Sequence, residues 1–208
     1  MKLEDFALLQ TSIEQALQQK TPIIIAIEGR SGSGKSSLAE KLGKLYDCNI
    51  ISMDDFFLQP AQRSSVRLAE AGGNVAYERL QAEVLLPLLA GKSFSYQPFD
   101  CLQQRFKDAK EFPIKPLNII EGVYSLHPTL SYAYDLKIFM TVDAEEQQSR
   151  IIKRSGFVKW QRFAEEWIPL EEAYFRATRT EEKCDVVISN LQIKSNLKKN
   201  SQFTIQNS

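Results

Sequence analysis

Apolar positions recur along this chain with two alternating periods. Runs of consecutive apolar, often β-branched residues indicate buried strands over 21–28, 48–53, 117–122, 136–142 and 185–188. Stretches with apolar residues at every third or fourth position indicate amphipathic helices over 3–19, 36–46, 77–90, 144–154 and 160–182. Strands that alternate with helices predict an α/β fold, in which a mostly parallel sheet carries helices on both faces.

Two segments depart from this alternation. Residues 93–113 carry short aromatic pieces on both sides of Pro98, which predict an irregular hairpin inserted into the α/β frame. Residues 59–75 are polar, contain glycine and are weakly periodic, as expected of a mobile loop over a site. No internal repeat is visible, so we expect one domain over 1–190, followed by a loosely attached polar tail over 191–208.

Composition sets outer limits on the function. The 208 residues balance 26 Lys and Arg against 26 Asp and Glu, which argues against a nucleic-acid partner. The three cysteines are scattered and form no C-x-x-C pair, a usage typical of a reducing compartment. No apolar run approaches the roughly 18 residues of a membrane span, and the N-terminus lacks the apolar centre of a signal peptide. We therefore expect a cytoplasmic protein without a membrane partner.

The sequence GRSGSGKS at residues 29–36 is the most informative feature of the chain. It completes the pattern G-x-x-x-x-G-K-[ST] between a predicted strand and a predicted helix, the context in which this pattern binds phosphate. Glycine lets backbone amides approach a ligand closely, and the N-terminus of the following helix attracts anions. We expect these residues to bind the nucleotide: Gly29, Arg30, Ser31, Gly32, Ser33, Gly34, Lys35, Ser36 and Ser37.

Phosphoryl transfer also needs positive charge near the phosphates and a metal ion. Lys35 can reach the β- and γ-phosphates, and the Ser36 hydroxyl can bind Mg²⁺. Magnesium prefers oxygen ligands, and Glu121 ends an apolar strand, where packing explains a lone carboxylate poorly. The carboxyl ends of parallel strands meet at one edge of a sheet, so these residues are expected to face one crevice. They predict ATP and Mg²⁺ as cofactors.

Two neighbouring aspartates compete for the role of general base. Asp54 and Asp55 follow the strand predicted over 48–53, and alternation along a strand points their side chains in opposite directions. One carboxylate could accept the proton of an alcohol acceptor, while the other caps the turn that begins at Phe56. The residues alone leave this choice open.

A cationic helix face and several aromatic residues complete the candidate site. Arg150 and Arg154 lie four residues apart and share one face, so we expect a lid over about 150–165 in which at least one of them stabilises the transferred charge. Such a face is often only solvated. Tyr96 and Phe99 alternate along the predicted hairpin and could stack on a planar acceptor, and Phe57 either borders the acceptor pocket or packs in the core.

Taken together, several segments resemble the uridine kinase group of P-loop kinases, which also includes phosphoribulokinase, one class of pantothenate kinase and nicotinamide riboside kinases. The similar segments span about residues 22–190 and read GRSGSGKSSLA, SMDDFF, YQPFDC, NIIEGVYSL, VDAEEQQSRIIKR and CDVVISN. The phosphate loop occurs in many families, whereas Asp after the second strand with Glu-Gly after a later one is more specific. The resemblance implies a three-layer P-loop NTPase fold and an ATP-dependent kinase that phosphorylates a hydroxyl group of a small metabolite.

The resemblance also implies roles for individual residues. It makes Asp54 the catalytic base and a neighbour of Mg²⁺, and it makes Glu121 the acidic partner of the metal. It places Phe99, Asp100 and the residues that follow them in the acceptor pocket. The predicted acceptor site therefore consists of Asp54, Phe57, Tyr96, Phe99, Asp100 and Gln104.

The acceptor segment departs from the uridine kinase pattern at three positions. Phe99 stands where these enzymes typically have Tyr, Gln104 where they have His, and Val75 where they have an Asp that binds ribose. A buried ligand hydroxyl needs polar partners, so these changes weaken the case for uridine while leaving the case for a kinase intact. Asn74 or Glu78 could supply the missing contact.

Other functions fit parts of the sequence. A kinase for pantothenate, nicotinamide riboside or another sugar-like metabolite would share the phosphate half of the site. A non-catalytic ATP-binding regulator would keep the loop, although Lys35, Ser36, Asp54 and Glu121 together favour catalysis. A GTPase switch is disfavoured because the chain lacks N-K-x-D and D-x-x-G elements, and a transporter ATPase because it lacks an LSGGQ-like segment. The leading prediction is a nucleoside kinase, and the resemblance leaves a homo-oligomer open.

Overall fold

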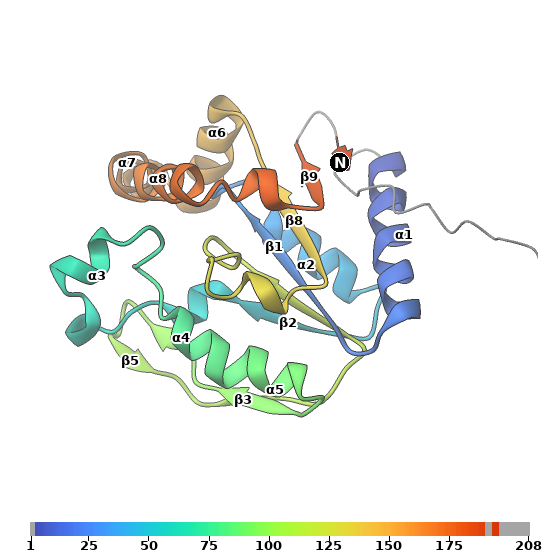
Figure 1. The fold of residues 1–208 in the computed structure, drawn as a ribbon. Coiled ribbons are helices and arrows are strands. Elements are labelled where there is room, and N and C mark those ends of the chain that lie inside the picture. The colour runs from blue at the N-terminus through green and yellow to red at the C-terminus, as the bar shows by residue number, and fades with distance from the viewer. Residues whose placement is uncertain (1–2, 190–192, 196–208) are drawn as a thin grey trace, which may run out of the picture.

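A six-stranded sheet forms the centre of the computed structural model, which describes residues 3–189 and 193–195 (Figure 1). Its strands lie in the order β10, β9, β8, β1, β7, β2. Their bounds are β1 Ile23–Gly29, β2 Cys48–Ser52, β7 Leu117–Glu121, β8 Leu136–Met140, β9 Val186–Ile188 and β10 Ile193–Ser195. Every neighbouring pair is parallel except β9 and β10, which confirms the mostly parallel sheet expected from the sequence.

Helices cover both faces of this sheet. They are α1 Leu3–Gln19, α2 Lys35–Gly43, α4 Tyr77–Leu80, α5 Leu86–Leu89, α6 Ala144–Ser155, α7 Phe157–Arg162 and α8 Ile168–Thr178. The central strand β1 is buried along its whole length, as expected of a parallel strand with helices on each side. Its odd-numbered isoleucines join the apolar cluster with α1 and α2, whereas Ile24 and Ala26 join the cluster with α4, α5 and α8. The three-layer arrangement is thus confirmed.

Two long helices each contain a π segment just before a proline. Gln81–Leu85 connects α4 with α5 and precedes Pro87, and Phe163–Trp167 connects α7 with α8 and precedes Pro169. Proline has no amide hydrogen to donate to the residue four positions earlier, so the hydrogen-bond ladder widens locally without ending the helix. The second helix therefore runs without interruption from Phe157, three residues earlier than predicted. It ends at Thr178 because Arg179 adopts a left-handed conformation with φ of 51°.

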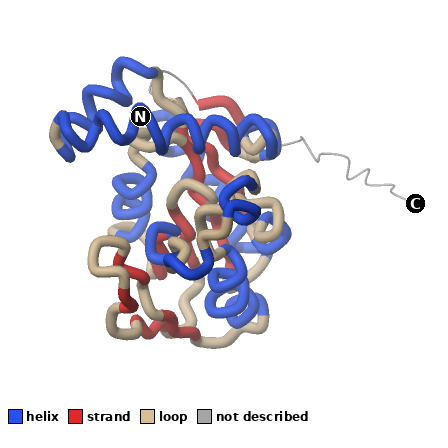
Figure 2. Tube along the Cα trace, turned by 90° about the vertical axis from the view of Figure 1, so that its left-hand side faces the viewer, coloured by secondary structure: helices blue, strands red, loops and turns tan. Residues whose placement is uncertain are grey.

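The predicted hairpin is present as two short antiparallel ladders. One pairs β3 (Phe94–Tyr96) with β6 (Lys110–Phe112), and the other pairs β4 (Phe99–Asp100) with β5 (Arg105–Phe106). Figure 2 shows the short strands set apart from the main sheet, at the lower end of the molecule.

The segment between the aspartates and this hairpin has more regular structure than expected. In place of a plain loop, residues 59–75 contain a 3₁₀ turn at Pro60–Gln62 and the short helix α3 (Ser65–Ala69). The Ser64 side chain caps α3 by accepting from the Arg67 amide at 3.1 Å.

The end of the chain differs from the sequence-based expectation in one respect. Within the tail predicted over 191–208, Ile193–Ser195 form β10 at the edge of the sheet. The other residues of that tail lie outside the described part of the chain, so the division at residue 190 stays a prediction. No helix among the described residues is long and apolar enough to cross a membrane.

Candidate active site

The fold brings four predicted site residues to one edge of the sheet. The central strands β1, β7 and β2 are adjacent and parallel, so their carboxyl ends meet there. The phosphate loop with Lys35 and Ser36 follows β1, Glu121 ends β7, and Asp54 follows β2. The Ser36 hydroxyl donates to the Glu121 carboxylate at 3.0 Å, which joins the loop to the end of β7.

The phosphate loop begins at a position that only glycine can occupy. Gly29 has φ of +137°, and a Cβ atom there would lie 1.9 Å from the carbonyl oxygen of Met140 on β8. The Arg30 amide donates to that same carbonyl at 3.1 Å. Close backbone contact with β8 therefore fixes the direction in which the loop leaves the sheet.

Lys35 holds the loop closed from within. Its Nζ donates to the carbonyl oxygens of Gly29 at 2.7 Å and Arg30 at 3.0 Å. Burial lowers the pKa of Lys35, and nearby carboxylates oppose that shift. In decreasing order of effect, these carboxylates belong to Glu171, Glu28, Glu121 and Asp54. The Lys35 amine is thus surrounded by carboxylates, next to the place where the phosphates are expected.

The hydrogen-bonding state of the loop suits a phosphate ligand. The Ser33 hydroxyl is buried, and no described residue serves as its hydrogen-bond partner. Helix α2 begins directly after Gly34, which provides no side-chain cap for its amides. Uncapped amides at a helix N-terminus and an unpartnered hydroxyl in the same loop are groups that an anion can satisfy.

The oxygen ligands at this edge also suit Mg²⁺. Ser36 and Glu121 offer a hydroxyl and a carboxylate, and Asp54 offers a second carboxylate nearby. Among the residues the structure describes, no three Asp, Glu, His or Cys side chains converge so as to hold a metal by themselves. Magnesium commonly takes only one or two carboxylates and completes its coordination with water and substrate phosphates, so this sparse set fits it.

The two neighbouring aspartates have different environments. Asp55 accepts from the Tyr96 hydroxyl and from Lys110 Nζ, both at 2.8 Å, and so ties the hairpin to the end of β2. Asp54 forms no hydrogen bond or ion pair with any described residue, and it is exposed after the end of β2. The surrounding protein still excludes enough water to raise the pKa of Asp54, against the opposing charge of Lys35. This geometry favours Asp54 as the base.

The hairpin residues expected to line the acceptor pocket are largely engaged in the hairpin itself. The Tyr96 ring is buried and stacks on Phe112 with ring centroids 5.3 Å apart, and the Phe99 ring packs edge-on against Phe106 at 5.5 Å. The Tyr96 ring also lies 4.7 Å from the Phe56 ring, and with Phe94 it joins the apolar cluster that includes the residues of α4 and α5. The structure therefore shows no free stacking surface at Tyr96 or Phe99.

Asp100 and Gln104 form the turn at the tip of the hairpin. The Asp100 carboxylate accepts from the amides of Leu102 at 2.8 Å and Gln103 at 3.0 Å. Gln104 is exposed, and its side-chain amide donates to the carbonyl oxygen of Cys101. Asp54 and the half-buried Phe57 are the predicted acceptor residues that take no part in these hairpin contacts.

Helix α6, in which the predicted lid begins, contacts the phosphate loop. Arg150 Nη1 donates to the carbonyl oxygens of Gly32 at 3.2 Å and Ser33 at 3.4 Å, while its Nε donates to Glu146 at 2.8 Å. Arg154 lies close enough to Asp54 to lower the pKa of that carboxyl. Arg150 thus contacts the loop directly, and Arg154 lies near Asp54.

Sequence reasoning missed Glu28, which organises the interior of the site. This carboxylate is fully buried at the end of β1 and accepts four hydrogen bonds. The donors are the amides of Gly29 at 3.1 Å, Tyr124 at 2.9 Å and Leu126 at 2.9 Å, and the Tyr174 hydroxyl at 3.2 Å. Burial raises the pKa of Glu28 to about 7. Its signal in the sequence was a single charge inside an apolar strand.

Glu28 should make the stability of the protein depend on pH. Because the pKa of about 7 in the folded state exceeds the ordinary value of 4.5, the folded protein binds this proton more tightly than the unfolded chain. Its contribution to the free energy of unfolding is therefore fully present below pH 4.5 and is lost as the pH rises through 7. We expect Glu28→Gln to remove this decrease in the free energy of unfolding. Urea unfolding at several pH values between 4.5 and 8 measures the decrease in both proteins.

The same variant should also be less stable overall. An amide in place of the carboxylate turns an NH₂ group toward two of the four donors, at a cost of about 1–3 kcal/mol. Glu40→Gln on the exposed side of α2 is the matched control and should keep the pH dependence of the parent. An unchanged pH slope in Glu28→Gln would show that Glu28 does not titrate in this range.

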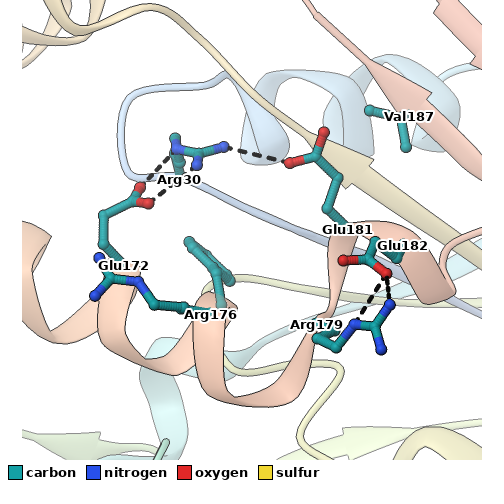
Figure 3. Close-up of a pocket in the computed structure, with 8 residues that line it drawn as sticks. Arg30, Glu172, Arg176, Arg179, Glu181, Glu182 and Val187 are labelled. Carbon is teal, nitrogen blue, oxygen red and sulfur yellow. Dashed lines mark hydrogen bonds and ion pairs between the residues drawn. The ribbon is translucent and has the colours of Figure 1, made fainter.

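A cavity of about 510 Å³ lies behind the phosphate loop (Figure 3). Arg30 spans it, with Nε 2.6 Å from Glu172 of α8 on one side and Nη1 3.8 Å from Glu181 on the other. The rest of the lining comes from Phe175, Arg176, Arg179, Glu182 and Val187. Asp54 and Glu121 are absent from the lining, so this cavity is separate from the predicted acceptor site.

Comparison with known proteins places these observations in context. No family model matches the chain. A Clostridium perfringens protein named uridine kinase is 30% identical over 143 residues, which make up 65% of this chain and 67% of that relative.

Solved structures show the same fold at lower identity. A structure described as a possible uridine kinase from Bacillus stearothermophilus aligns with a TM-score of 0.63 and 18% identity, covering 86% of this chain and 98% of the other. The D-glycerate 3-kinase of Cryptococcus neoformans aligns with a TM-score of 0.57 and 12% identity, covering 91% and 99% of the two chains. The three-layer fold inferred from the sequence is therefore shared with solved kinases.

Proposed function

Because this chain belongs to the uridine kinase family of P-loop kinases, we propose that it transfers the γ-phosphate of ATP to a hydroxyl group of a nucleoside. The observation that carries the proposal is the edge of the sheet where Lys35, the Ser36–Glu121 pair and the unpaired Asp54 converge. These groups supply phosphate binding, metal binding and proton acceptance, which are the requirements of phosphoryl transfer to an alcohol.

Each group has a distinct task in this proposal. Lys35 and the loop amides bind and orient the phosphates, and Ser36 with Glu121 would hold Mg²⁺, which neutralises phosphate charge when bound. Asp54 accepts the proton of the attacking hydroxyl. Burial raises its pKa, and a base is most effective when its pKa approaches the working pH. Arg150 and Arg154 of the predicted lid stabilise the negative charge of the transferred phosphoryl group.

The acceptor half of the site favours a ligand that carries hydroxyl groups. The Asn74 side chain and the Asp54 carboxylate both lie near enough to the Tyr124 hydroxyl to act on its pKa, which burial raises. Uridine kinases have an Asp that binds ribose at the position of Val75. Asn74 is one of the two neighbouring residues that could make this contact instead. Polar groups here suit the hydroxyls of a ribose or a related sugar.

A second group of acceptors is favoured by the packing of the hairpin. Since Tyr96 and Phe99 are buried against other aromatic rings, they offer no open face to a planar base. Pantothenate and other acceptors without a planar base are therefore the next candidates on this ground. Nicotinamide riboside, which carries a planar ring, stays an alternative through the resemblance alone. A cytoplasmic location and assembly into a homo-oligomer stay predictions.

A coupled assay of ADP release with Mg-ATP tests the proposal. The panel comprises uridine, cytidine, the other nucleosides, nicotinamide riboside, pantothenate and simple sugars. We expect one nucleoside to raise ADP release well above the rate without acceptor. A response to pantothenate or a simple sugar alone would reassign the acceptor. A flat panel, with ATP binding confirmed by calorimetry, would favour the non-catalytic regulator instead.

A further inference from the structure

Two consecutive glutamates of α8 hold two consecutive residues of the phosphate loop. Glu171 accepts from the Ser31 amide at 3.0 Å with one oxygen and from the Ser31 hydroxyl at 2.5 Å with the other. Glu172 accepts from Arg30 Nε at 2.6 Å and from Arg30 Nη2 at 3.0 Å. Neither glutamate belongs to the phosphate-binding pattern, and both lie about 140 residues further along the chain.

Ser31 is held at every one of its polar atoms. Glu171 binds its amide and hydroxyl, and Gln147 of α6 donates from Nε2 to its carbonyl oxygen at 2.8 Å. The backbone and side-chain orientation of Ser31 are therefore set from outside the loop, by two helices. Such contacts fix a residue more tightly than the loop backbone can by itself, because each one restricts a different bond rotation.

Stability alone is a poor explanation for Glu171. Its side chain is only 4% exposed, and burial raises its pKa, so the position is costly for a carboxylate. It also lies near the Lys35 ammonium and exerts the largest charge effect on it of any carboxylate. A buried negative charge beside a site for anions disfavours phosphate binding. Its presence is explained if the same carboxylate holds the loop in the conformation that binds phosphate.

We infer that Glu171 is a positioning residue that sets Ser31, and through it the phosphate loop, in the conformation that binds the triphosphate. Glu172 supports the same arrangement through Arg30. Because α8 continues without interruption from α7, the contact also joins the loop to the lid helices. The inference deepens the proposed kinase function and rests on it.

A double-mutant cycle between Ser31 and Glu171 tests this inference. The variants are Ser31→Ala, Glu171→Gln and the pair, and Mg-ATP affinity is measured by calorimetry without an acceptor. We expect each single change to weaken ATP binding about tenfold and the double change to cost clearly less than the two single changes together, because both disrupt the bond between the Ser31 hydroxyl and the Glu171 carboxylate. With the acceptor found in the panel, KM for ATP should rise more than kcat falls.

Glu166→Gln is the matched control, since this exposed carboxylate of the same long helix pairs only with Arg162 among described residues. It should leave ATP affinity unchanged. Additive losses that follow the melting temperature, or unchanged affinity in both single variants, would overturn the positioning role. If Glu171→Gln does not fold, Ser31→Ala alone must weaken ATP binding.

Hydrogen exchange separates this inference from the proposed function. The amides of residues 29–36 should exchange faster in Glu171→Gln than in the parent without nucleotide, whichever ligand the loop binds. Equal exchange would refute the positioning role even for an active kinase. Faster exchange in a protein that binds no ATP would leave the positioning role standing and remove the kinase.

Discussion

Replacing Asp54 with asparagine should lower kcat by about a hundredfold to ten-thousandfold while ATP affinity stays nearly the same. Asparagine keeps the shape of the side chain but cannot accept the proton of the attacking hydroxyl. Asp54 forms no hydrogen bond with the described part of the protein, so the change removes chemistry without breaking a structural contact. Steady-state kinetics with the identified acceptor and calorimetry with Mg-ATP measure the two effects separately.

Asp55→Asn is the matched control for this prediction. Asp55 anchors the hairpin through Tyr96 and Lys110, so its loss should lower the melting temperature and raise KM for the acceptor, with a much smaller effect on kcat. The opposite pattern, an active Asp54→Asn and an inactive Asp55→Asn, would exchange the roles assigned to the two residues.

Replacing Lys35 with methionine should weaken ATP binding and turnover together, with a loss in kcat/KM of at least about a hundredfold. Methionine keeps most of the volume of the buried side chain and removes its charge. The carboxylates of Glu171, Glu28, Glu121 and Asp54 would then face the phosphates without a neutralising cation. The apo protein should stay folded with a lower melting temperature, because methionine fills the buried site but leaves the carbonyl oxygens of Gly29 and Arg30 without the Lys35 donor.

Lys44→Met at the exposed end of α2 is the control and should bind ATP like the parent. Calorimetry and thermal unfolding on both variants distinguish loss of binding from loss of fold. Normal ATP affinity in Lys35→Met would remove Lys35 from phosphate binding and with it the main premise of the kinase mechanism.

The sequence predicted the sheet and the helices well, and it predicted which side chains meet at one edge of the sheet, because these depend on local patterns. The isoleucine run of β1 and the spacing of Leu38 and Leu42 in α2 are readable from a few neighbouring residues. The meeting of Lys35, Asp54 and Glu121 then follows from the rule that parallel strands end at the same edge.

What the sequence did not reveal are contacts between distant residues. In the sequence, nothing distinguishes Glu28, Glu171 and Glu172 from other glutamates. Only the fold brings them into contact with the amides of the loop and the guanidinium of Arg30. The packing of Tyr96 onto Phe112 was equally invisible, because a short aromatic strand looks the same whether its rings face a ligand or one another.

The structured segment at 59–75 has a similar cause. Arg67 donates to the carbonyl oxygens of Gly73 at 3.0 Å and Val75 at 2.8 Å, and it pairs with Glu78 at 2.6 Å. One guanidinium with five donors can order a loop that has no hydrophobic period of its own. Sequence periodicity carries no information on such an arrangement.

The position of the acceptor segment in the chain bears on how new specificities arise in this fold. Most of the predicted acceptor half comes from one continuous stretch, residues 53–116, which leaves the sheet after β2 and returns at β7. The loop at residues 29–36, which precedes that stretch, is held by its own contacts with α6 and α8. Exchange of the acceptor stretch as a single block would keep Asp55 together with its partners Tyr96 and Lys110, because all three lie within it, and would have to preserve Asp54.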